Sequence, residues 1–211
     1  MRLLIAAGMT WEVPEEAFDL YIGVDRGALV LARSDHPLDI AVGDFDSMSA
    51  AEFAEVEEKA ERLIKYPSEK DLTDTEAAFD LVLEEFPNAE ITLIGSLGGR
   101  LDHLLTNVYL PTRPKYQALA QQITVIDGEN VVEYYQPGKH ILHNIYRKIY
   151  LGFVEVNTKN SLEIVGAKYP LKAGQGFSDI YASNEFIDDN PVTIQHSKGI
   201  VIVIYSSDKE K

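Results

Sequence analysis

The chain has 211 residues, of which 45% are hydrophobic and 25% charged, as in an ordinary globular protein of one large or two small domains. Its 34 acidic and 19 basic residues give a formal net charge of −15, which disfavours nucleic acid and anionic membrane surfaces as partners. Cysteine is absent, which excludes disulfides and thiolate metal sites, and the apolar runs are too short for a membrane helix, so we expect a soluble, cytoplasmic protein.

Up to about residue 122, short apolar runs alternate with stretches of helical pattern. Strands are expected at 3–7, 21–24, 39–42, 63–66 and 91–94. Helices are expected at 14–20, 28–33, 49–61, 73–86 and 101–110. The helix at 73–86 has the clearest start, because Thr73 and Glu76 form a capping-box pattern before an apolar run. Strands that alternate with helices predict a Rossmann-like α/β domain with a parallel sheet.

From residue 123 onward the helical pattern gives way to short β-branched and aromatic runs that are separated by turn residues. Strands are expected at 123–126, 131–135, 148–156, 161–165, 178–183 and 200–205. Such a pattern is typical of a small all-β sandwich or jelly roll. The sequence therefore predicts an α/β domain at 1–122 and a β-sandwich domain at 123–211.

Two aspartates, Asp44 and Asp46, directly follow the apolar run 40–42 in the segment Gly-Asp-Phe-Asp-Ser, 43–47. At the end of a strand, residues two apart lie on the same side. Two carboxylates about 4 Å apart repel by about 4 kcal/mol at an effective dielectric constant near 20. One interpretation is a Mg²⁺ site for a phosphorylated substrate, and the other is an ordinary turn built from Gly, Asp and Ser.

Polar residues also follow the neighbouring strands, at 25–27, 70–74 and 98–103. In an open parallel sheet, ligands bind at the carboxyl ends of the strands, where these loops meet. Asp74 or Asp71 could complete an oxygen ligand set, although both also suit the start of a helix. Gly98, Gly99 and Arg100 could hold phosphate through backbone N–H groups and a guanidinium. Asp102 and His103 follow in the first turn of that helix, where His103 could position a substrate or be structural.

Five motifs in this order carry a resemblance to a known family. They are Gly-Asp-Phe-Asp-Ser at 43–47, Lys-Asp-Leu-Thr-Asp at 70–74, Gly-Gly-Arg-Leu-Asp-His at 98–103 with Asn107, Gly-Ala-Lys-Tyr-Pro-Leu at 166–171 and Ser-Asn-Glu-Phe at 183–186. Together they resemble the bacterial thiamine pyrophosphokinases over nearly the whole chain. The resemblance implies a catalytic α/β domain that binds ATP, then a β-sandwich that binds thiamine and takes part in a homodimer. The implied reaction moves the pyrophosphoryl group of ATP onto the hydroxyethyl oxygen of thiamine and releases AMP.

The resemblance also assigns roles to residues of this chain, with each active site shared between two subunits. The implied Mg²⁺ set is Asp44, Asp46 and Asp74, with Asp71 as a further catalytic residue. The residues expected around ATP are Asp25, Ser47, Lys70, Thr73, Arg100, Asp102, His103 and Asn107. Those expected to face thiamine are Ser183 and Asn184.

Two departures from the family pattern and two rival functions stay open at this stage. Ala167 replaces a leucine, and the segment 150–153 lacks the serine and proline expected on that strand. The Asp-x-Asp pair also resembles that of sugar-nucleotide transferases and of haloacid-dehalogenase-like phosphatases, although the phosphatases carry it on the first strand. The other rival is a non-catalytic protein that senses thiamine or a nucleotide.

Overall fold

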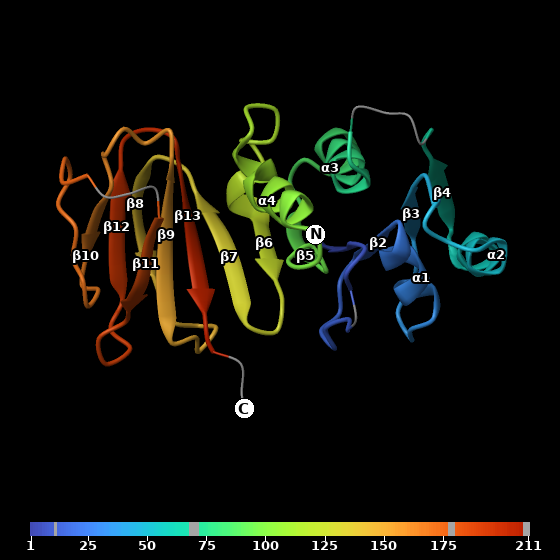
Figure 1. Cartoon of the computed structure of the whole chain (residues 1–211), viewed down its shortest axis with the longest axis horizontal. Helices are drawn as coiled ribbons and strands as arrows, with labels where there is room; N and C mark the ends of the chain where they lie inside the picture. The colour runs from blue at the N-terminus through green and yellow to red at the C-terminus, as the bar shows by residue number, and fades with distance from the viewer. Residues whose placement is uncertain (11, 68–71, 177–179, 209–211) are drawn as a thin grey trace. The chain divides into compact units, whose positions relative to one another are not determined.

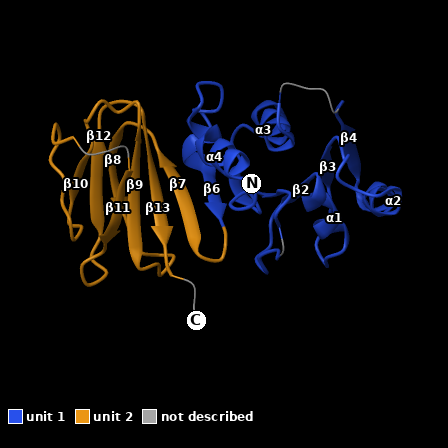
Figure 2. Ribbon diagram, in the orientation of Figure 1, with its two compact units in different colours: residues 1–126 blue, residues 127–211 orange. Residues whose placement is uncertain are grey.

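The computed structural model describes residues 1–10, 12–67, 72–176 and 180–208. The chain divides into two compact units, Met1–Ile126 and Asp127–Lys211 (Figure 2). None of the helices in the described ranges is long and apolar enough to cross a membrane.

The first unit is built on a parallel sheet (Figure 1). Its described strands are β1 (Arg2–Ala6), β2 (Leu20–Val24), β3 (Ile40–Gly43), β4 (Arg62–Lys65), β5 (Glu90–Ile94) and β6 (Ile123–Ile126). They lie in the order β6-β5-β1-β2-β3-β4, and every adjacent pair is parallel. β6 was expected to open the second domain, but it pairs with β5 and belongs to the first unit. Because all the strands run the same way, the loops that follow them meet at one edge of the sheet.

Helices connect the strands from β2 to β6 and pack on the sheet. They are α1 (Arg26–Ala32), α2 (Ala50–Lys59), α3 (Asp74–Glu85) and α4 (Leu101–Tyr109), with short 3₁₀ turns η1 (Leu110–Thr112) and η2 (Ala120–Gln122). The core around α1 and α2 includes Leu4, Ala28 and Val56, all fully buried.

The helix expected at 14–20 is wrong, because this segment forms bends that lead into β2. Its polar groups are bound to the start of β1 instead of forming a helical ladder. The guanidinium of Arg2 donates to the backbone carbonyl of Ala17 at 3.0 Å and pairs with Glu16. The carboxyl group of Asp19 accepts the backbone N–H of Arg2 at 2.7 Å. Long-range contacts of this kind override a weak local helical pattern.

The second unit contains two antiparallel sheets. Its described strands are β7 (Asn130–Tyr135), β8 (Gly138–Leu142), β9 (Tyr150–Val156), β10 (Glu163–Val165), β11 (Ile180–Glu185), β12 (Val192–His196) and β13 (Ile200–Ser206). One sheet has the order β11-β9-β13-β7 within this unit, and the other has the order β10-β12-β8. The sequence pattern did not predict β8 and β12, which form most of the smaller sheet. Phe153 on β9 and Val203 on β13 are completely buried in this unit.

Two glycines allow α1 to approach the sheet closely. A Cβ atom on Gly27 would lie 2.0 Å from the backbone oxygen of Ala6, and one on Gly23 would lie 2.3 Å from the Cα of Ala28. Both distances are far below van der Waals contact, so only glycine fits. This contact sets the position of Asp25, which directly precedes α1.

We expect Gly27→Ala to lower the free energy of unfolding by about 1–3 kcal/mol or more, because the new methyl group overpacks a backbone contact. Urea unfolding followed by circular dichroism measures the change. The matched control is Gly8→Ala, because a Cβ there meets nothing within 4 Å. The control should stay within about 0.5 kcal/mol of the wild type. Equal stability of the two variants would contradict the proposed close contact.

Candidate active site

The loop after β3 places two aspartates at the sheet edge by burying the residue between them. Phe45 is only 4% exposed and packs in the core, with its ring centroid 5.2 Å from that of Phe53. Its backbone takes a left-handed conformation, with φ of 60°. Such a conformation costs free energy in a bulky residue and persists only where the surroundings enforce it. Asp44 and Asp46 flank this anchor, and Asp46 is exposed.

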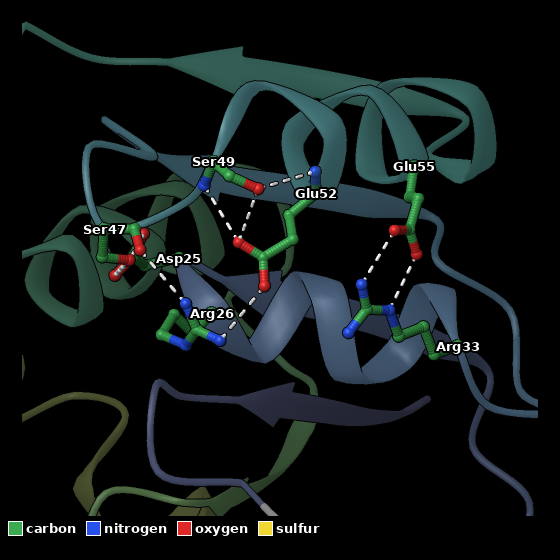
Figure 3. Close-up of polar contacts among 7 residues, drawn as sticks. All are labelled: Asp25, Arg26, Arg33, Ser47, Ser49, Glu52 and Glu55. Carbon is green, nitrogen blue, oxygen red and sulfur yellow. Dashed lines mark hydrogen bonds and ion pairs between the residues drawn. The ribbon is translucent and has the colours of Figure 1, made fainter.

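The loop is tied to the start of α1 and α2 by a group of hydrogen bonds (Figure 3). The hydroxyl of Ser47 lies 3.0 and 2.9 Å from the two carboxyl oxygens of Asp25. Arg26 donates to the backbone oxygen of Ser47 at 3.1 Å and lies 3.5 Å from the carboxyl group of Glu52. Glu52 in turn completes a capping box with Ser49 at the start of α2. Arg26 was not singled out from the sequence, although its Asp-Arg-Gly segment was noted.

Four aspartates interact electrostatically at this edge: Asp25, Asp44, Asp46 and Asp74. The charge of Asp44 is the largest cause of a raised pKa for Asp46, and Asp74 adds to it. Burial is the main cause of the raised pKa of Asp25, with further contributions from Asp74 and Asp44, while a hydrogen bond from Ser47 opposes the rise. Clustered carboxylates that repel one another suit a bound cation, because its charge removes the repulsion.

The donor chemistry of these residues fits Mg²⁺, which takes oxygen ligands and binds through one or two carboxylates together with phosphates and water. Among the described residues, no group of three or more His, Asp or Glu side chains is arranged so that it could hold a metal ion. Phosphate oxygens would therefore have to supply part of the coordination.

The start of α3 brings Asp74 to this group. The hydroxyl of Thr73 accepts the backbone N–H of Glu76 at 3.2 Å, which confirms the Thr73 half of the expected capping box. Glu76 is buried and forms an ion pair with Arg113 at 2.7 Å. Lys70 and Asp71, which the sequence also placed at the site, lie outside the described residues.

The loop between β5 and α4 holds a second group of expected site residues. Gly99 has a left-handed backbone, with φ of 66°. Arg100 pairs with Asp102 through two contacts of 2.6 and 3.1 Å, and this partner lowers the pKa of Asp102. His103 is exposed, and its backbone N–H donates to Asp102. Asn107 donates to the backbone oxygen of Ser96 at 3.1 Å and so holds the loop. The Arg100–Asp102 ion pair is exposed, so breaking it costs little free energy. Each of the two side chains could therefore bind a ligand group in place of its partner.

In the second unit, Ser183 and Asn184 lie at an irregularity between β11 and β9. Ser183 is exposed and has a φ of 60°. Asn184 is completely buried. Its side-chain amide oxygen accepts the backbone N–H of Tyr169 at 2.9 Å, and its amide nitrogen donates to the backbone oxygen of Tyr169 at 2.8 Å. The side chain of Asn184 therefore holds the 168–170 turn, and Ser183 is the member of the pair that meets solvent.

Comparisons with known proteins place this geometry in a family. Residues 15–125 match the family model described as "Thiamin pyrophosphokinase, catalytic domain". Residues 139–201 match "Thiamin pyrophosphokinase, vitamin B1 binding domain". The chain belongs to the thiamin pyrophosphokinase family.

Individual members of the thiamin pyrophosphokinase family are similar to the chain over most of their length. The chain is 34% identical to a thiamine pyrophosphokinase from Bacillus subtilis over 194 aligned residues. The alignment covers 90% of this chain and 88% of the relative. A crystal structure of a thiamin pyrophosphokinase family protein from Enterococcus faecalis matches with a TM-score of 0.91 and 40% identity, over 99% of this chain and 100% of that one. Thiamin pyrophosphokinase from Candida albicans, at 17% identity and a TM-score of 0.75 over 98% of this chain and 90% of that one, shares the fold.

We expect Asp46→Asn to raise the melting temperature of the protein in EDTA at neutral pH, because it removes the repulsion from Asp44. Folding raises the pKa of Asp46 above 3.8, so ionisation disfavours the folded state as pH rises through the folded value. The gain should therefore disappear near about pH 3, where the carboxyl group is neutral in both states. Differential scanning calorimetry at the two pH values measures it.

The control for this experiment is Asp35→Asn, which makes the same change at an exposed residue beyond α1. This variant should melt close to the wild type at both pH values. A melting temperature of Asp46→Asn below that of the wild type at neutral pH would show that Asp46 is not a site of repulsion.

Proposed function

We propose that the protein transfers the pyrophosphoryl group of ATP to the hydroxyethyl oxygen of thiamine and releases AMP, in a Mg²⁺-dependent reaction. The observation that carries this proposal is the electrostatic coupling of four aspartates at the carboxyl edge of a parallel sheet, in a chain of this family. The parallel unit would be a Rossmann-like catalytic domain, and the second unit a thiamine-binding β-sandwich. We place the proposed reaction in the cytoplasm.

In the proposed reaction, the thiamine hydroxyl oxygen bonds to the β-phosphorus of ATP as the bond from that phosphorus to the α,β-bridging oxygen breaks. AMP leaves with the bridging oxygen, and the hydroxyl proton is released to water. Phosphoryl transfer of this type depends on positioning and charge neutralisation more than on covalent chemistry by the protein. Asp71 precedes the proposed metal ligand Asp74 by three residues in the sequence, and we propose it as a further catalytic residue.

The residues proposed to hold Mg²⁺ are Asp44, Asp46 and Asp74. When bound, the ion would neutralise both the aspartates and the phosphate oxygens of ATP. The buried Phe45 fixes the backbone between two of these ligands, so their side chains would have to turn toward the ion while the backbone stays in place.

ATP would lie along the same sheet edge, and eight residues are proposed to surround it. They are Asp25, Ser47, Lys70, Thr73, Arg100, Asp102, His103 and Asn107. Arg100 would exchange Asp102 for phosphate oxygens, which its planar guanidinium can bind in pairs. Ser47, Thr73 and Asn107 already make hydrogen bonds that hold their loops, so we propose that they shape the site.

Thiamine would meet the second unit at Ser183, with Asn184 supporting the loop from inside the fold. We further propose a homodimer in which each site is shared between subunits. The surface of α4 supports this idea, because Leu101, Leu105 and Tyr109 are 68%, 46% and 36% exposed at intervals of four residues. Apolar residues at this spacing form one face of a helix, which a second copy could cover.

With ATP, thiamine and MgCl₂, we expect the protein to form thiamine diphosphate and AMP in equal amounts. Chromatographic separation of the nucleotides measures the product directly, and EDTA should stop the reaction. ADP as the product would rule out pyrophosphoryl transfer. Binding of thiamine without any turnover would instead favour a sensor.

We expect Asp44→Asn, Asp46→Asn and Asp74→Asn each to lower kcat by about two orders of magnitude or more, because each removes a proposed ligand of the ion that offsets transition-state charge. Circular dichroism should show unchanged secondary structure. Asp35→Asn is again the control and should keep normal turnover. Turnover close to normal in the three active-site variants would refute the metal assignment.

A further inference from the structure

In the second unit, one carboxyl group joins three tyrosines from different parts of the chain. The hydroxyl of Tyr135 on β7 donates to Oε2 of Glu133 at 2.6 Å, and that of Tyr205 on β13 donates to the same oxygen at 3.0 Å. The hydroxyl of Tyr146 donates to Oε1 at 2.7 Å. Hydrogen bonds to a carboxyl group are among the stronger ones in proteins, and here both oxygens are used.

Tyr146 differs from the other two because it lies outside the strands, in the connection between β8 and β9. Exposure alternates along this connection: Asn144, Tyr146 and Lys148 are half-buried, while His143, Ile145, Arg147 and Ile149 are exposed. The inward-facing residues make the anchoring contacts. Besides Tyr146, Lys148 donates through Nζ to the backbone oxygen of Gly128 at 2.8 Å.

This connection forms one wall of a cavity of about 670 Å³, and residues 185–189 contribute the other wall. The side-chain amide of Asn144 donates to the carboxyl group of Asp189 at 3.1 Å and so joins the two walls. Ile145 and Ile149 supply apolar surface, and Glu185 and Asp189 supply carboxyl groups. Arg147 and Lys148 also line the cavity, and Glu185 is paired with Lys168. The lining is therefore balanced in charge, and its apolar surface with polar groups beside it suits a small ring compound.

The cavity is close in sequence to the proposed thiamine contact. Its second wall begins directly after Ser183 and Asn184, and both walls fall inside the segment that matches the vitamin B1 binding domain, 139–201. The ring of Phe186 on that wall stacks against Tyr205, with centroids 6.3 Å apart and planes 18° from parallel. Tyr205 therefore contacts Phe186 with its ring and Glu133 with its hydroxyl, so it links the second wall to the carboxyl group that binds Tyr146.

We propose that the Glu133–Tyr146 hydrogen bond is a positioning contact that holds residues 143–149 in place for thiamine binding. This inference rests on the proposed function. Glu133 and Tyr146 act through the wall that they hold, and neither is assigned a part in the transfer step. Loss of the bond should loosen the wall and weaken thiamine binding, while ATP binding and the chemical step stay as they are.

The experiment compares Tyr146→Phe with Tyr135→Phe, which remove one hydroxyl each from the same carboxyl group. Tyr135→Phe is the matched control, because Oε2 keeps its hydrogen bond from Tyr205 and Oε1 keeps Tyr146. Steady-state kinetics should give a thiamine KM about tenfold higher for Tyr146→Phe, the scale expected for one hydrogen bond to a charged group. Its ATP KM and kcat should stay within about twofold of the wild type, and the control should match the wild type in all three.

The result that would overturn the inference is an unchanged thiamine KM in a folded Tyr146→Phe protein, or an equal rise in the control. If Tyr146→Phe fails to fold, Asn144→Ala provides the second test, because it breaks the contact between the walls and should raise the thiamine KM in the same way. Absence of turnover in the wild type would refute the proposed reaction alone. Calorimetric titration with thiamine then decides the positioning role, and equal affinities of the wild type and Tyr146→Phe would refute it.

Discussion

The candidate site depends on mutual repulsion between carboxylates that the fold holds together. Asp44 raises the pKa of Asp46, and burial together with Asp74 and Asp44 raises that of Asp25. Left to itself, a flexible loop would relax by moving these charges apart. The buried Phe45 prevents this, because releasing its ring to water would cost about 1.5–3 kcal/mol. Hydrophobic burial at one residue thus maintains an unfavourable arrangement at its two neighbours.

The same repulsion makes the site selective for what binds there. A dense negative charge repels free nucleotide phosphates, since the whole chain already carries −15. Phosphate can approach when a divalent cation stands between it and the aspartates. Arg100 lies in another loop and is occupied by Asp102, so it offers a modest local attraction. The proposed site would therefore accept a nucleotide more readily as its metal complex than as free phosphate.

The sequence was sufficient to predict the features that depend on local pattern. The order of strands and helices predicted the parallel sheet, and parallel strands bring their following loops to one edge, as observed for the loops after β2, β3 and β5. The helix expected at 14–20 was wrong because side chains distant in sequence bind that segment. β8 escaped prediction because it opens with Gly and Lys, residues depleted in strands, and its half-exposed face shows little apolar alternation. The alternation of Val192, Thr193 and Ile194 was the signal that could have found β12.

Residue types alone also could not separate side chains that meet a ligand from those that support the fold. Ser183 and Asn184 are adjacent in sequence, but one is exposed and the other has its amide bound to the backbone of Tyr169. The cluster around Glu133 was invisible for a related reason, because its partners lie 2, 13 and 72 residues away. No periodic pattern records such pairings, since they arise only when the strands are assembled.

The carboxyl groups of the two units differ in their surroundings: those of the first unit repel one another, and Glu133 of the second accepts several hydrogen bonds. In the first, Asp25 and Asp44 accept hydrogen bonds, but the charges of Asp44 and Asp74 still raise the pKa values of Asp25 and Asp46. In the second, Glu133 has three hydroxyl donors, so the protein itself satisfies its oxygens. Carboxylates that repel one another attract a cation, whereas a carboxylate with several hydroxyl donors fixes the side chains that surround it. The first arrangement therefore suits ligand binding, and the second suits the support of a pocket wall.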